Sequence, residues 1–266
     1  RSYFEARVPS TPTMLLELLS HQNLADMRLG HDPNFKFVVS RAIYKAILRH
    51  LSAQYGVPYC VTPLPVNSFA TSPAGDGAVR LSWKATVDSL ENTAKPTAYV
   101  VYTREGDGGF DNGRIVTDNS LIINQKPDVI YSYRVTAINA GGESFPSEIL
   151  TVCQLSDAKA TAMIVNGFDR VAAPECRKDG FHNEFDSGVA YLRDVAFIGE
   201  QLVHDISKRR EKSEPRAFGV SFSNHQGNIV GGNSFDYPYL HGKSLLAAGC
   251  SFYSSSVAVV ESREVD

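Results

Sequence analysis

Five polar side chains of this 266-residue sequence stand where chemistry could occur. Glu17 lies among leucines in TPTMLLELLSH, so a buried carboxylate there would need a hydrogen bond, a metal or a catalytic task. On an edge strand the same glutamate would simply face solvent, and the pattern leaves both readings open. Asn166 and Asp169 follow a predicted strand, and Asp236 and His241 lie in GNSFDYPYLHG. These four are candidate ligand-binding residues, because α/β folds place ligands just past their strand ends.

The same C-terminal residues also permit a hydrolase. Asp169, Asp236 and His241, with the serines at 254–256, provide an acid, a base and a nucleophile. The chain has no GxSxG elbow, no phosphate loop and no GxGxxG motif. Because acids and histidines fill strand-end loops in most α/β domains, a purely structural role stays open beside the catalytic one.

The bulk composition excludes several classes of protein. A hydrophobic content of 43% and a net charge of −3 indicate a globular chain with no general attraction to nucleic acid or acidic membranes. No apolar run approaches the ~20 residues that a membrane span requires. The four cysteines, at 60, 153, 176 and 250, lack metal-ligand spacing, so no metal ligand is assigned in this chain.

Residues 1–58 are predicted to be part of an α/β domain. TPTMLLELLSH is expected to form an apolar strand, and a long helix should follow, with Asp32 as its N-cap, Pro33 in its first turn and Gly56 at its end. The apolar stripe of this helix requires a sheet to cover it. Residues 59–65, with prolines at 63 and 65, are predicted to be a stiff, extended linker.

Residues 66–154 are predicted to form an all-β sandwich. VRLSW places Val79, Leu81 and Trp83 on one face, and VIYSYRVTAIN alternates in the same way from Tyr131. Glycine- and asparagine-rich turns separate the strands, and no helical period interrupts them. The segment resembles fibronectin type III domains, in which a tryptophan ends the second strand, as Trp83 does, and a tyrosine precedes the strand that matches RVTAIN.

Residues 158–266 are predicted to form a separate, incomplete α/β domain. TAMIVNGF indicates a buried parallel strand, YLRDVAFIGEQLVHDI a helix, PYLHGKSLLAAG a short helix and CSFYSSS another strand. The expected fold class is therefore multi-domain, α/β plus all-β.

MLLELLSHQN followed by VSRAIYKAILRHL resembles the end of the zinc-dependent N-acetylmuramoyl-L-alanine amidases. In that family an apolar strand carries the catalytic glutamate, which Glu17 matches, and a final helix follows. Ser20 and Asn23 match the family's Ser-Asn only loosely, and Leu19 stands where phenylalanine is usual. The resemblance implies that Glu17 takes a proton from a zinc-bound water, which cleaves the amide bond between muramic acid and alanine in peptidoglycan.

The resemblance also implies zinc ligands, two histidines and a glutamate, ahead of this strand. Only Glu5 and no histidine precede Glu17, so the zinc ligands would lie outside this chain. The chain is then expected to be inactive unless a separate N-terminal segment of the same protein supplies them.

The order of the three regions resembles secreted multi-domain proteins labelled xanthan lyase-like. The resemblance implies a secreted, periplasmic or cell-surface protein whose partner is peptidoglycan or another surface glycan. The first hypothesis is a cell-wall amidase fragment. The alternative is a non-catalytic secreted protein that binds glycans or adheres to surfaces, or a polysaccharide-acting protein of the xanthan lyase-like group.

Overall fold

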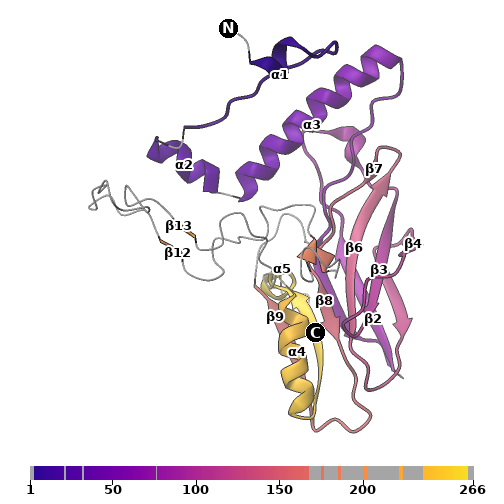
Figure 1. Ribbon diagram of the computed structural model, residues 1–266. Helices are drawn as coiled ribbons and strands as arrows, with labels where there is room; N and C mark the ends of the chain where they lie inside the picture. Colours follow the sequence, from indigo (N-terminus) through magenta and orange to yellow (C-terminus); the bar gives the residue numbers. More distant parts are fainter. Residues whose placement is uncertain are drawn as a thin grey trace. The chain divides into compact units, whose positions relative to one another are not determined.

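The computed structural model describes residues 3–20, 22–31, 33–75, 77–167 and 236–262, together with four two-residue strands between 175 and 223. The chain divides into two compact units, Arg1–Val57 and Pro58–Asp266. Figure 1 shows the helices and strands of both units.

The first unit is helical over its described residues. Its helices are α1 (Phe4–Arg7), α2 (Leu24–His31) and α3 (Pro33–Tyr55). The predicted long helix is confirmed, and Gly56 follows it with φ of +65°, as a helix-ending glycine does. Asp32, the predicted N-cap, lies outside the described residues. No described helix is long and apolar enough to cross a membrane.

The apolar strand predicted around Glu17 is wrong for the residues described. Residues 11–20 have no regular secondary structure, and every one of them is exposed. Pro9 and Pro12 have no backbone N–H to offer a neighbouring strand, and the described part of this unit contains no strand that could pair with the segment. The α/β character expected for residues 1–58 is therefore not found in its described part.

The second unit confirms the predicted β-sandwich. One face is built on β1 (Asn67–Pro73), β2 (Ala78–Lys84) and β5 (Ser120–Asn124), paired in the order β5-β2-β1. The other contains β3 (Ala98–Glu105), β4 (Arg114–Val116), β6 (Tyr131–Asn139), β7 (Gly142–Glu143) and β8 (Leu150–Val152), with β3 and β6 at its centre. All these pairings are antiparallel.

The alternation seen in the sequence places the core between the two sheets. Trp83 is 2% exposed, and its ring meets Tyr99 edge to face with centroids 5.5 Å apart. Tyr133 is fully buried and Tyr131 nearly so. Burial raises the pKa of Tyr133 to about 12, since the charged phenolate would lose its hydration. Trp83 and Tyr131 are therefore core residues, as the sequence predicted.

Residues 58–65 pack against the sandwich instead of spanning a gap. The hydroxyl of Tyr59 donates to Glu91 Oε2 at 2.9 Å, and Asn139 Nδ2 donates to the carbonyl of Val61 at 2.9 Å. Val61 is completely buried. The segment has no regular secondary structure. The predicted linker is thus bound along the sandwich by side-chain hydrogen bonds.

The C-terminal region adds two strands to the first sheet. β9 (Ala160–Asn166) and β14 (Cys250–Ser256) pair in parallel, and β14 pairs antiparallel with β1, so the full order is β5-β2-β1-β14-β9. The parallel strand predicted from TAMIVNGF is confirmed. The separate α/β domain expected for residues 158–266 is not, because β14 takes a free edge of the sandwich as its partner.

Two helices complete the described C-terminal region. α4 (Tyr237–Ala247) precedes β14 and packs on β8, β9 and β14 (Figure 1), and α5 (Val257–Glu261) follows β14 directly. A helix was predicted at 191–206, but the two described residues of that range form the strand β12 (Gln201–Leu202), which pairs with β13 (Phe222–Ser223). A second short pair consists of β10 (Glu175–Cys176) and β11 (Phe185–Asp186).

Helix α4 approaches the sheet closely at one glycine. A Cβ on Gly242 would lie only 2.2 Å from the ring of Phe252 on β14, although Gly242 has ordinary helical backbone angles. Phe252 is completely buried. The missing side chain therefore sets the distance between helix and strand.

Replacing this glycine tests the packing of α4. Glycine to alanine within a helix normally stabilises it, but Gly242→Ala should lower the free energy of unfolding by about 1–3 kcal/mol because the methyl group overpacks the Phe252 ring. Chemical denaturation followed by Trp83 fluorescence measures the change. The second variant, Gly242→Ala with Phe252→Leu, should lose less than the two single changes combined. Stabilisation by Gly242→Ala alone would contradict this packing.

Candidate functional site

A polar groove of about 510 Å³ lies on the sheet that β14 and β9 extend. Residues from β1, β2, β9, β14 and α5, and from β5 with the residue before it, line the groove, so both the sandwich and the C-terminal strands build it. The lining is rich in hydroxyl groups and consists of Ser68, Ala70, Thr71, Ser72, Pro73, Arg80, Ser82, Trp83, Lys84, Asn119, Ser120, Met163, Ser255 and Val259.

The strand register arranges the serines in a row across the sheet. Ser82 pairs with Ser120 on one side and with Ala70 on the other, and Ala70 pairs in turn with Ser255. With strands about 4.8 Å apart, this row of four positions spans about 14 Å. Ser82 and Ser120 are half-buried and present hydroxyl groups that both donate and accept hydrogen bonds, whereas Ser255 is completely buried.

The groove is positively charged. Arg80, Ser82 and Lys84 alternate along β2 and so point to the same face, with both cations exposed. No aspartate or glutamate is among the described lining residues. The side chains of Arg80 and Lys84 only donate hydrogen bonds, which favours a ligand rich in acceptor oxygens.

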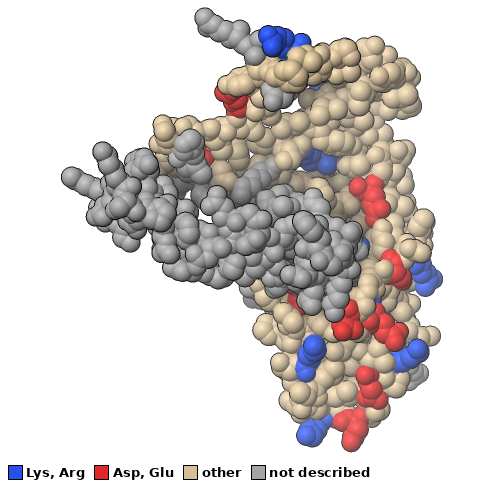
Figure 2. Space-filling model, viewed as in Figure 1, with Lys and Arg blue, Asp and Glu red and all other residues tan. Residues whose placement is uncertain are grey.

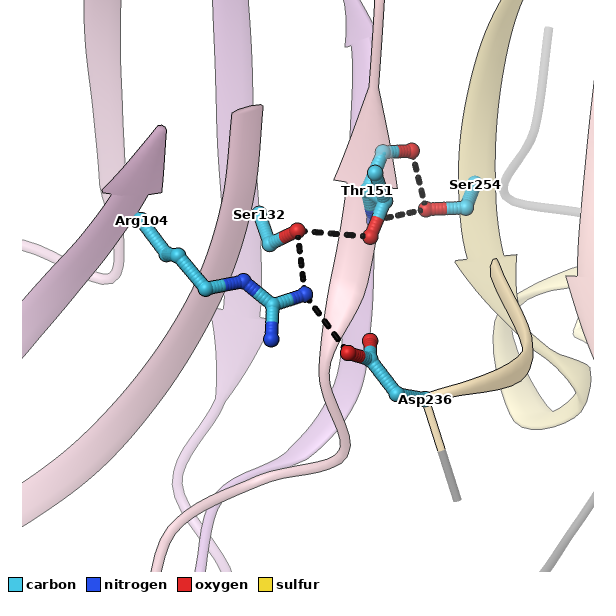
Figure 3. Close-up of polar contacts among 5 residues, drawn as sticks. All are labelled: Arg104, Ser132, Thr151, Asp236 and Ser254. Atoms are coloured by element: carbon cyan, nitrogen blue, oxygen red, sulfur yellow. Dashed lines mark hydrogen bonds and ion pairs between the residues drawn. The ribbon is translucent and has the colours of Figure 1, made fainter. Parts of the chain in front are cut away.

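A second polar feature is buried at the seam between sandwich and C-terminal region (Figure 3). Arg104 on β3 is 3% exposed, and its Nη2 lies 2.7 Å from Oδ2 of Asp236, the residue that directly precedes α4. The same nitrogen donates to Ser132 Oγ at 2.8 Å, and Ser132 Oγ lies 3.1 Å from Thr151 Oγ1. This chain of contacts ties β3, β6 and β8 to the start of α4.

The network continues to β14 through Ser254. The backbone N–H of Thr151 donates to Ser254 Oγ, and Ser254 Oγ donates to the carbonyl of Thr151, both at 2.7 Å. The backbone N–H of Ser254 donates to Thr71 Oγ1 at 2.9 Å, and that hydroxyl donates back to the carbonyl of Ser254. Ser254 is completely buried and is bonded to both sheets.

Arginine side chains stack on aromatic rings beside this network. The guanidinium of Arg104 lies 4.9 Å from the ring centroid of Tyr239, and that of Arg134 lies 5.0 Å from Tyr102. Phe110 lies between the two arginines, 5.2 Å and 4.4 Å from them. Burial, followed by the hydrogen bond to Glu143, raises the pKa of Tyr102 to about 12 although Arg134 acts in the opposite direction. These contacts are structural and orient Arg104 toward α4.

Breaking the ion pair should be costly. Arg104→Ala leaves the Asp236 carboxylate buried without its cation, and we expect a loss of about 3–5 kcal/mol in the free energy of unfolding. The double variant Arg104→Met with Asp236→Leu, which removes both charges, should recover most of that loss. The matched control is Arg114→Ala, an exposed arginine on β4, which should change stability by less than about 0.5 kcal/mol. Urea unfolding measures all three, and equal effects of Arg104→Ala and Arg114→Ala would contradict a stabilising pair.

The structure places Glu17 on an exposed, irregular segment. Among the described residues, no group of three or more histidine, cysteine, aspartate or glutamate side chains could hold a metal ion. The residues that the structure describes therefore do not form a zinc centre by themselves.

Asn166 and Asp169, predicted as ligand-binding residues, have different outcomes. Asn166 is the last residue of β9, is 5% exposed, and pairs in register with Ser256 on β14. Its Oδ1 and the Ser256 hydroxyl are buried without hydrogen-bond partners. Asn166 thus lies at the carboxyl end of a parallel strand, as predicted, and its ligand role stays a prediction. Asp169 lies outside the described residues.

Asp236 and His241, the other two candidates, occupy different environments. Asp236 is buried against Arg104, whereas His241 is exposed on α4 with its ring stacked 6.4 Å from that of Tyr237. The hydroxyl of Ser254, one of the serines available to a hydrolase, is hydrogen-bonded to the backbone N–H and carbonyl of Thr151. Asp236 and Ser254 therefore hold elements of the fold together, and a ligand role for His241 stays a prediction.

Sequence reasoning missed the groove. The pattern Val79, Leu81, Trp83 was recognised as a core face, and the opposite face of the same strand carries Arg80, Ser82 and Lys84. That alternation was a usable signal for a polar surface. The contribution of Ser255 and Met163 could not be predicted, because it depends on strands separated by more than 70 residues from β2.

Figure 2 shows how charge is distributed over one face of the molecule. Acidic and basic side chains are interspersed on the part in view, without one large region of a single sign. Local groups of charge, such as the pair on β2, therefore matter more than the net charge of −3.

No protein-family profile and no curated protein matches this chain. Similar solved structures include the fibronectin type III domain of human fibronectin type III domain containing protein 3, at 23% identity over 37% of this chain and 91% of that one, with a TM-score of 0.31. The FN5 domain of Drosophila Lar matches at 19% identity over 36% of this chain and 99% of that one, with a TM-score of 0.28.

Larger proteins are matched over a small part of their length. The C. elegans twitchin kinase region is 25% identical over 37% of this chain, with a TM-score of 0.31, and the match spans 18% of that chain. A fibronectin type III domain, the kind of domain that residues 66–154 resemble, is thus among the similar solved structures.

Proposed function

We propose that this chain is a non-catalytic, secreted or cell-surface protein that binds a glycan in the groove on the extended sheet. The groove itself is the observation that supports the proposal. The hydroxyl groups of Ser82 and Ser120 and the amide of Asn119 can exchange hydrogen bonds with sugar hydroxyls. Sugar chains present such groups at every residue.

The groove suits a glycan better than an extended peptide. Peptides commonly bind to sheets by adding a strand to an edge, where backbone groups are unpaired. The groove lies on β1, β2 and β14, whose backbones are already paired with neighbours on both sides. Recognition there depends on side chains, and polar side chains on a face match hydroxyl groups of a ligand.

Filling the groove tests the proposal. Ser82→Trp introduces a large ring at the centre of the serine row and should reduce binding to insoluble glycans at least about ten-fold. Co-sedimentation of the full chain with peptidoglycan sacculi, chitin and insoluble plant polysaccharides measures binding. Ser89→Trp, at an exposed turn that does not line the groove, is the matched control and should bind as the unmodified chain does. Binding to none of these polymers would contradict the proposal.

The amidase hypothesis makes a different prediction for the same material. If the chain only binds, peptidoglycan incubated with it and added zinc should release no soluble fragments, and Glu17→Gln should change neither binding nor release. Dye release from labelled sacculi measures this. Release that depends on Glu17 would contradict a non-catalytic function and restore the amidase hypothesis, with metal ligands from elsewhere.

A further inference from the structure

The cations of the groove narrow the kind of ligand. Arg80 and Lys84 lie on the same face of β2 on either side of Ser82. Their Cα atoms are four steps apart along the strand, a distance of about 13 Å. That separation exceeds a single sugar ring, so the two cations would contact different sugars of one chain. The charges are part of the groove wall and not of a distant rim.

The hydrogen-bonding groups of the cations in the groove also favour a ligand that carries carboxylates. Arginine and lysine donate hydrogen bonds and accept none. A neutral sugar offers donors and acceptors equally, whereas a carboxylate offers only acceptors. Carboxylates therefore complement this wall better than hydroxyl groups alone.

The described lining also lacks the repulsion that would reject such a ligand. It contains two cations and no carboxylate, although the whole chain carries a net charge of −3. Charge-assisted hydrogen bonds between arginine or lysine and a carboxylate are stronger than neutral ones. The groove is thus a local positive site on a weakly acidic protein.

We propose that the groove binds an acidic glycan, a sugar chain that carries carboxylates, with Arg80 and Lys84 each contacting a carboxylate on a different sugar. This inference rests on the proposed glycan-binding function and specifies its ligand. Serine and Asn119 side chains bind the ring hydroxyls between the two charges. Binding weakens with ionic strength, because both cations are exposed to solvent.

A pair of matched oligosaccharides tests the inference. Titration calorimetry compares oligogalacturonate with the same oligomer after methyl esterification, which removes the charges and keeps the sugar. The full chain should bind the acidic oligomer about ten-fold more tightly at low salt, and the difference should shrink at about 0.5 M salt. Arg80→Gln with Lys84→Gln should remove the preference, because it weakens binding of the acidic oligomer far more than binding of the esterified one.

A control variant distinguishes the effect of cations in the groove from the effect of cations elsewhere on the surface. Arg114→Gln with Lys126→Gln removes two exposed cations that do not line the groove, and it should keep the preference for the acidic oligomer. Equal binding of both oligomers would overturn the acidic ligand and leave glycan binding intact. An equal loss in both double variants would also overturn it. Binding of neither oligomer, nor of any insoluble glycan, would overturn the inference and the proposed function together.

Discussion

Strand β14 forms hydrogen bonds with both sheets of the sandwich at once, and much of the C-terminal architecture depends on this constraint. Its backbone pairs with β1 at Ser255 and bridges Cys153, just beyond β8, at Phe252. Between those points the ladder to each sheet is incomplete, and the Ser254 and Thr71 hydroxyl groups supply the missing donors and acceptors. Small hydroxyl side chains are suited to this, because they hydrogen-bond to backbone at close range.

The remaining C-terminal elements follow from the position of β14. β9 uses its outer edge as a parallel partner, and α4 covers it at the contact between Gly242 and Phe252. Arg104 then joins the start of α4 to the sandwich through Asp236. Both charges lose their hydration on burial, which offsets most of their attraction. The ion pair therefore fixes the position of α4 on the sandwich more than it adds net stability.

The extension of the sheet also creates the groove. A three-stranded face β5-β2-β1 would end at β1, with its polar side chains on an open surface. β14, β9 and α5 add Ser255, Met163 and Val259, which supply the far wall. The positive charge comes from the sandwich and the enclosure from the C-terminal strands, so the site belongs to neither region alone.

The sequence by itself determined the elements whose periods are local. Alternation around Trp83 and Tyr131 predicted the sandwich, Pro33 and Gly56 bounded the long helix, and CSFYSSS predicted a strand. The expected strand at Glu17 failed because apolar residues alone do not form a strand without a partner for their backbone. Only the tertiary structure decided that β14 joins β1, that Asp236 meets Arg104, and that two regions share one groove. The physical reason is that hydrogen bonds and ion pairs between segments far apart in the chain leave no periodic trace in either segment.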